Sequence, residues 1–127
     1  MEIHLMNVNG VDLAELRSDQ FVIQQVQDAL DLLANCAYQG AEKIIVQEKH
    51  LTPGFFDLKT GLAGDILQKF STYRIQLAVV GDFSKFTSQS LRDFMYESNQ
   101  VGRINFVASV DEAIAKLTHG RLNSGVS

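Results

Sequence analysis

The feature that most constrains the fold is the run at residues 75–80, IQLAVV, which is apolar at every position except Gln76. Residues 44–46 (IIV) and 104–107 (INFV) form similar short runs. Strands that are covered on both faces, as in a parallel sheet, lack the polar–apolar alternation of half-exposed strands. We therefore predict three parallel strands, with residues 75–80 as the central one.

Segments with apolar residues at helical spacing lie between and around these runs. The predicted helices cover residues 19–38, 60–72, 88–98 and 109–120. Ser18 or Asp19 is a suitable N-cap for the first helix, and Thr60 for the second. The last helix begins with a capping box, in which Ser109 is followed three residues later by Glu112.

The chain starts with a different pattern, because residues 3–16 alternate around Asn9-Gly10, a pair that favours a two-residue hairpin turn. Strands that alternate with helices require parallel pairing through right-handed crossovers. We predict an α/β fold with a mixed, mostly parallel sheet, an N-terminal antiparallel hairpin and about four helices, which cover one or both faces. A single domain is expected over residues 1–120, followed by a flexible tail at 121–127.

Composition narrows the class of protein. The 127 residues carry 11 basic and 15 acidic side chains, a formal charge of −4, and the basic residues are scattered. Nucleic-acid binding needs a basic surface, so we expect none. Cys36 is the single cysteine and favours a reducing compartment, where a buried, inert thiol is expected. No signal peptide or membrane-spanning run is visible, which favours the cytoplasm.

The loop before the second helix is the first candidate site. Its residues Asp57, Lys59, Thr60 and Gly61 stand where unpaired N–H groups and the helix dipole attract an anion or a partner's polar group. The preceding pair Phe55-Phe56 needs burial and would anchor this loop. The alternative is that Thr60 is only a helix cap and Asp57 only fixes the loop.

Polar residues also follow two of the predicted strands. Glu48 and His50 come after residues 44–46, and Asp82 and Ser84 come after residues 75–80. The carboxyl ends of parallel strands are where sites collect in open α/β sheets. A histidine with carboxylates can transfer protons or hold a metal, but no metal-ligand or nucleophile motif is present, so these residues can equally be ordinary polar loop residues.

One stretch suggests a family. Phe56-Asp57, Thr60-Gly61-Leu62-Ala63, the strand Leu77–Gly81 and the closing Phe106-Val107 with Asp111–Ile114 resemble the STAS domain of anti-sigma factor antagonists and sulfate transporters. In antagonists the resemblance implies a loop reading Asp-Ser-Ser/Thr-Gly-Leu-Gly, whose first Ser a partner kinase phosphorylates. Here Leu58 follows Asp57 and the loop is one residue longer, so Thr60 is the candidate phosphoacceptor. The stretch resembles still more closely a family of short bacterial proteins of unknown function with this STAS-like fold.

Three functional hypotheses follow. The first is a non-enzymatic regulatory or protein-interaction domain, whose partner is of the kinase or sigma-regulatory type by resemblance. The alternative is a small-ligand- or anion-binding protein or a small enzyme that uses Glu48, His50, Asp57 and Asp82. The third is a homodimer that pairs through the hairpin edge. No metal or cofactor is expected.

Overall fold

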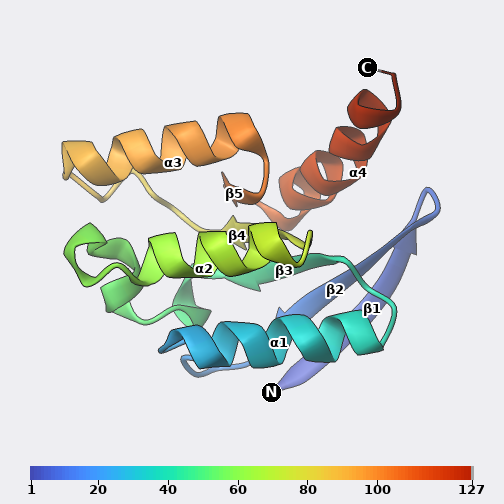
Figure 1. Ribbon diagram of the computed structural model, residues 1–127, viewed down its shortest axis with the longest axis horizontal. Helices are drawn as coiled ribbons and strands as arrows, with labels where there is room; N and C mark the ends of the chain where they lie inside the picture. Colours follow the sequence, from blue (N-terminus) through green and yellow to red (C-terminus); the bar gives the residue numbers. More distant parts are fainter. Residues whose placement is uncertain (127) are drawn as a thin grey trace.

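A single five-stranded sheet organises the chain, with its strands in the order β1-β2-β3-β4-β5 (Figure 1). The computed structural model describes the backbone of residues 1–126 and the side chains of residues 1–119. The strands are β1 (Glu2–Val8), β2 (Val11–Arg17), β3 (Lys43–Gln47), β4 (Gln76–Val80) and β5 (Ile104–Val107). β1 and β2 are antiparallel, and every later pairing is parallel.

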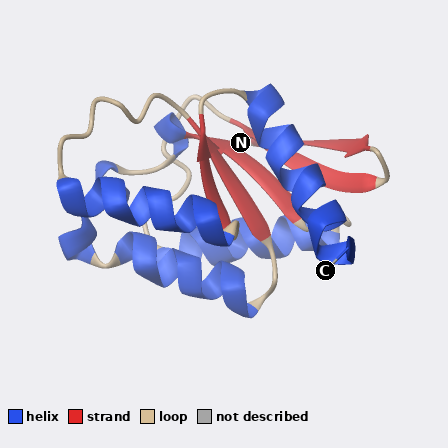
Figure 2. Ribbon diagram, turned by 90° about the horizontal axis from the view of Figure 1, so that it is seen from above, coloured by secondary structure: helices blue, strands red, loops and turns tan. Residues whose placement is uncertain are grey.

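The helices cover both faces of the sheet unequally. Each connection from β2 to β5 moves one strand in the same direction, and right-handed crossovers of that kind place their helices on one face. Accordingly α1 (Val26–Tyr38), α2 (Leu62–Thr72) and α3 (Gln89–Val101) share one face, while α4 (Val110–Val126) packs on the other (Figure 2). The strands β3, β4 and β5 are therefore buried on both faces.

The core residues show this burial strand by strand. Within β3, Ile44 packs in the core under α1, α2 and α3, and its neighbour Ile45 packs in the core under α4. Leu77 and Ala78 divide in the same way in β4. All four side chains are fully buried. This explains why the two strands read as continuous apolar runs, and the predicted fold class, a mixed and mostly parallel sheet with a hairpin and four α-helices, is confirmed.

The prediction that residues 75–80 form the central strand is wrong, because this strand lies one place away from the middle of the sheet. β3 occupies the middle of the sheet and β4 is its neighbour, because both strands of the hairpin lie on the β3 side. The hairpin turn itself is confirmed. Asn9 and Gly10 have φ angles of 52° and 83°, the two left-handed residues that such a turn requires.

The first helix begins seven residues later than its predicted start at residue 19. Ile23 forms a parallel bridge with Leu51, and its N–H donates to the carbonyl of His50. The Asp28 carboxylate then accepts from the N–H groups of Gln24 and Gln25, which fixes the start of α1. Ile23 is fully buried in an extended segment, so it does not belong to the helical stripe that its spacing predicts.

The last helix continues beyond its predicted end, since the backbone of α4 is helical through Val126. A flexible tail over residues 121–127, and a single domain over 1–120, stay predictions, and residue 127 lies outside the described chain. Among the residues that the structure describes, no helix combines the length and the apolar character that a bilayer crossing requires.

Candidate functional site

The loops after β3 and β4 meet at the carboxyl-terminal edge of the sheet. The chain after β3 folds into three short 3₁₀ helices, η1 (Glu48–His50), η2 (Pro53–Phe56) and η3 (Leu58–Thr60). Because each parallel strand is followed by a helix, the N-termini of α2, α3 and α4 also point to this edge. The positive ends of these helix dipoles therefore gather here.

Phenylalanine side chains join the two loops. Phe55 is fully buried and meets the ring of Phe56 edge to face, with the centroids 5.0 Å apart. Phe56 in turn stacks on Phe86 at 4.8 Å and lies 6.2 Å from Phe83. Phe83 packs edge to face on Phe106 of β5 at 5.3 Å. Aromatic pairs at these separations stabilise beyond their buried area, so the loops form one unit.

A groove of about 420 Å³ opens over this unit. Its lining residues come from the loops after β2, β3 and β4: Phe21, Glu48, Lys49, Leu51, Pro53, Phe56, Lys85 and Phe86. We call it the phenylalanine groove. Phe21 is 49 % exposed at its rim, a large apolar side chain left in water. The ammonium of Lys85 forms an ion pair with Glu48 and lies 5.5 Å from the centroid of the Phe86 ring.

Glu48 ties the groove to the first residue after β4. A Cβ atom placed on Gly81 would lie 2.7 Å from Oε1 and 2.8 Å from Cβ of Glu48. Only glycine fits at this position unless Glu48 moves. Glu48 is thus held between Gly81 and Lys85, and its role in the structure is to connect the two loops.

His50 has a structural position. It is buried, with 1 % of its surface exposed. Its Nδ1 accepts a hydrogen bond of 2.9 Å from the N–H of Gln47, so Nε2 carries the proton and donates to the carbonyl of Ser18, also at 2.9 Å. Burial lowers the pKa of His50 below its ordinary value. Both ring nitrogens are occupied, so the sequence-based choice of His50 as a ligand or proton-transfer group has no support from its geometry.

The predicted loop site at residues 57–61 is exposed and internally bonded. Asp57 caps η3, with Oδ1 accepting from the N–H of Lys59 at 3.1 Å. The hydroxyl of Thr60 shares its one proton between the carbonyls of Gly54 (2.7 Å) and Asp57 (2.9 Å), and it accepts from the N–H of Leu62 at 3.2 Å. The N-cap of α2 is Gly61, a left-handed glycine, so the N-cap lies one residue later than predicted and Thr60 supports the helix start from the position before it.

Asp82 and Ser84 form a turn of their own. Asp82 Oδ1 accepts from both the N–H (3.1 Å) and the hydroxyl (2.6 Å) of Ser84. These hydrogen bonds lower the pKa of Asp82, with a smaller contribution from Lys85. Both residues are exposed, and Gly81 and Asp82 line a separate shallow cavity of about 410 Å³ toward α4.

The predicted residues therefore share one edge of the sheet but are not brought together around one ligand. In the part of the chain that the structure describes, no three His, Cys, Asp or Glu side chains are placed to hold one metal ion. Sequence reasoning missed Phe21, Lys49, Lys85 and Phe86. A signal existed, because four of the eight phenylalanines lie in the loops after β3 and β4, two in each.

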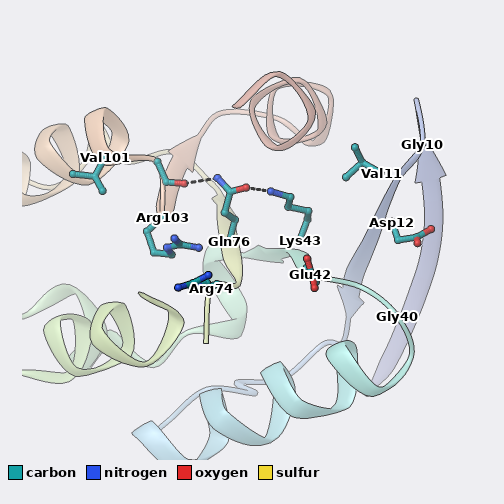
Figure 3. A pocket seen from close by; sticks show the side chains of 11 residues that line it. Gly10, Val11, Asp12, Gly40, Glu42, Lys43, Arg74, Gln76, Val101 and Arg103 are labelled. Atoms are coloured by element: carbon teal, nitrogen blue, oxygen red, sulfur yellow. Dashed lines mark hydrogen bonds between the residues drawn. The ribbon is translucent and has the colours of Figure 1, made fainter. Parts of the chain in front are cut away.

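The amino-terminal edge of the sheet holds a larger cavity, of about 660 Å³ (Figure 3). Its charged lining comprises Asp12, Glu42, Lys43, Arg74 and Arg103. Gln76 spans its floor: its Nε2 donates to the carbonyl of Gly102 at 2.8 Å, and its Oε1 accepts from the ammonium of Lys43. None of the site residues predicted from the sequence lies at this edge.

Charge balance explains this cavity without a ligand. The C-termini of α1, α2 and α3 all lie at this edge, and a helix C-terminus carries about −0.5 charge. Together with two carboxylates they offset the three basic side chains. The basic residues are therefore suited to stabilising helix ends, and the larger volume does not make this the better candidate site.

The chain matches a known protein family over most of its length. A family model described as "Domain of unknown function (DUF4180)" matches residues 8–117. No curated protein matches the chain. A solved structure from Thermotoga maritima, provisionally described as an anti-sigma factor antagonist, is similar over 90 % of this chain and 92 % of that chain, with 12 % sequence identity and a TM-score of 0.46.

Proposed function

We propose that this chain, which belongs to the DUF4180 family of domains of unknown function, is a non-enzymatic regulatory or protein-interaction domain whose partner docks on the phenylalanine groove. The observation that carries the proposal is the groove itself, where an apolar floor of Phe56 and Phe86 is rimmed by the exposed Phe21. Apolar patches with polar rims mark interaction sites, and aromatic residues are enriched there.

The charges of the groove favour an acidic partner. Lys85 and Glu48 form an ion pair, so their charges cancel locally. Lys49 is exposed and also lines the groove, so it adds a positive charge there. The N-termini of three helices add positive potential at the same edge. A segment that presents an apolar or aromatic side chain next to carboxylates would complement both features. The proposal keeps the cytoplasm as the location, which the single cysteine favours.

Thr60 connects the proposed regulation to the groove. Its hydroxyl donates to the carbonyl of Gly54, and Gly54 lies in η2 between the groove residues Pro53 and Phe56. Phosphorylation would remove this donor and add about −1.5 to −2 charge beside Asp57, with Lys59 and the start of α2 as the nearest compensating groups. A kinase or sigma-regulatory partner, as the family resemblance implies, would then change the shape of the groove.

The alternative of a small enzyme or ligand-binding protein has less support. His50 uses both ring nitrogens on backbone groups, and Glu48 is paired with Lys85. Asp57 and Asp82 each accept hydrogen bonds within their own turns. His50 would have to leave a backbone partner, and Glu48 its ion pair with Lys85, before either could bind a substrate, while Asp57 and Asp82 are held in two separate turns.

The proposal is tested by affinity capture from the native cell with three baits and quantitative mass spectrometry. The first bait is the unchanged protein, the second carries Phe21→Ser and Lys49→Glu, and the third carries Val101→Ser and Arg103→Glu. The third is a matched control, because it exchanges one exposed apolar and one basic residue at the amino-terminal cavity. We expect the specific partner to be reduced at least about tenfold, or about 1.4 kcal/mol, only with the second bait. Equal capture by all three baits would contradict the proposal.

A further inference from the structure

The outer edge of β1 has neither the lysine or proline nor the bulge that commonly protects an edge strand. β1 is the terminal strand of the sheet and lies along its open side (Figure 1). Its seven residues pair continuously with β2, from Glu2 opposite Arg17 to Val8 opposite Val11, so no bulge interrupts it. It contains neither lysine nor proline, and Leu5 near its middle is 44 % exposed. Long, regular, unprotected edges of this kind pair with another chain.

The hairpin register determines which backbone groups are available at this edge. Val8 and Val11 flank the two-residue turn, so they exchange both of their backbone hydrogen bonds. Hydrogen-bonded pairs then alternate along the ladder, and the even-numbered residues of β1 direct their N–H and C=O groups toward β2. The outward groups accordingly belong to Ile3, Leu5 and Asn7.

These outward residues are symmetric about Leu5, and we propose that two copies of the chain pair through β1, antiparallel about a two-fold axis that passes midway between the two copies of Leu5. In this register Leu5 faces the partner's Leu5, and Ile3 faces the partner's Asn7. Every outward N–H and C=O of the three residues is then hydrogen-bonded. A register centred on Ile3 or Asn7 leaves outward groups of the strand without partners.

A second copy fits this edge better than an unrelated peptide, because an interface about a two-fold axis must be self-complementary. The pairing places the exposed Leu5 against its own copy, and it needs no residue outside β1. The turn at the end of the hairpin projects beyond the body of the sheet, since β2 pairs with β3 only over Leu13–Glu15 (Figure 2). Only one strand from each copy takes part, so we expect a weak, concentration-dependent dimer.

Sedimentation velocity from about 1 µM to about 1 mM, the range of weak complexes, tests the pairing. We expect a reversible dimer for the unchanged protein and for Leu5→Val, which keeps the outward N–H. Leu5→Pro removes that N–H without removing a bond to β2, so it should weaken association at least about tenfold while circular dichroism stays unchanged. A protein that is monomeric throughout this range, or a dimer that Leu5→Pro leaves intact, would overturn the proposal.

Oxidative cross-linking determines the register of the β1–β1 pair. It also tests the pairing if Leu5→Pro fails to fold. In the proposed pair the two copies of Leu5→Cys have Cα atoms about 5.5 Å apart, within disulfide range. The two copies of His4→Cys are offset by two residues and about 8 Å apart, too far to bridge. The native Cys36 is buried and its pKa is raised to about 11, so it does not compete at neutral pH. Faster dimer formation by His4→Cys than by Leu5→Cys would overturn the proposed register.

Discussion

The two ends of the sheet present opposite kinds of surface. At the carboxyl-terminal edge, phenylalanine rings from two loops build a groove of about 420 Å³ with an exposed aromatic rim. At the amino-terminal edge, the lining of a cavity of about 660 Å³ includes five charged side chains and Gln76, with Val101 exposed at its rim. In the larger cavity, the basic side chains are offset by the negative C-terminal ends of three helices, together with two carboxylates. Volume alone therefore favours the amino-terminal edge, whereas the stacked aromatic rings and the exposed Phe21 favour the groove.

The sheet topology explains why the groove is built by loops. Open α/β sheets normally form their crevice where the strand order reverses, with helices leaving on opposite faces. Here the parallel strands follow chain order, so the described sheet has no such reversal. The groove depends instead on the three 3₁₀ helices after β3 and the loop after β4. The following predictions test whether that loop structure is rigid and whether the other edge is only structural.

The largest effect is expected from Phe55→Ala. Phe55 is fully buried beneath the groove and contacts the rings of both Phe56 and Phe106. Its truncation should lower the free energy of unfolding by about 3–5 kcal/mol, measured by urea denaturation. Phe21→Ala, at the exposed rim, is the control and should cost less than about 1 kcal/mol. Similar losses for both variants would show that the groove has no rigid aromatic base.

His50→Ala should cost about 2–4 kcal/mol, because the part-buried N–H of Gln47 and the carbonyl of Ser18 both lose their partner. The unchanged protein should also become less stable as the pH falls. The pKa of His50 is lower in the folded than in the unfolded state, so the unfolded chain binds more protons below about pH 6.5.

The contribution of His50 to the free energy of unfolding is therefore fully present above about pH 6.5. It is lost as the pH falls from that value toward the lower pKa that His50 has in the folded protein. Urea denaturation at a series of pH values should show this step for the unchanged protein. The step should be missing from His50→Ala. A step of the same size in both proteins would assign the pH dependence to other groups.

Gly81→Ala should destabilise the protein by about 1–3 kcal/mol, because the new Cβ would displace Glu48 from its position beside Lys85. Gly64→Ala gives a control of opposite sign. Gly64 lies inside α2 with no atom in reach of a new Cβ, so this change should stabilise by about 0.5–1 kcal/mol. Thermal unfolding compares the two, and an unaffected Gly81→Ala would mean that Glu48 does not couple the loops.

The smallest effect is expected at the amino-terminal edge. Gln76→Ala removes the link between Lys43 and the carbonyl of Gly102, but Asn105 Nδ2 still donates to that carbonyl at 2.9 Å. A loss of about 0.5–1.5 kcal/mol is expected, with partner capture unchanged. Reduced capture by a Gln76→Ala protein of unchanged fold would assign binding to this edge.

The sequence determines the fold more completely than the site. Short apolar runs, the Asn9-Gly10 turn and helical periodicity were enough for the fold class, and the expected family of unknown function is confirmed by the match over residues 8–117. The start of α1 was misplaced because Ile23 is buried by Leu51, a contact that no local pattern records. The groove was missed for the same reason, since Phe56 and Phe86 stack across thirty residues of chain.

The most direct test of the central claim is site-specific photo-cross-linking in the native cell. Benzoylphenylalanine is introduced at Phe21, on the rim of the groove, or at Val101, on the rim of the amino-terminal cavity; both side chains are largely exposed. We expect a discrete cross-linked partner from position 21 and none from position 101. A partner captured only from position 101 would contradict the assignment of the interaction site to the phenylalanine groove.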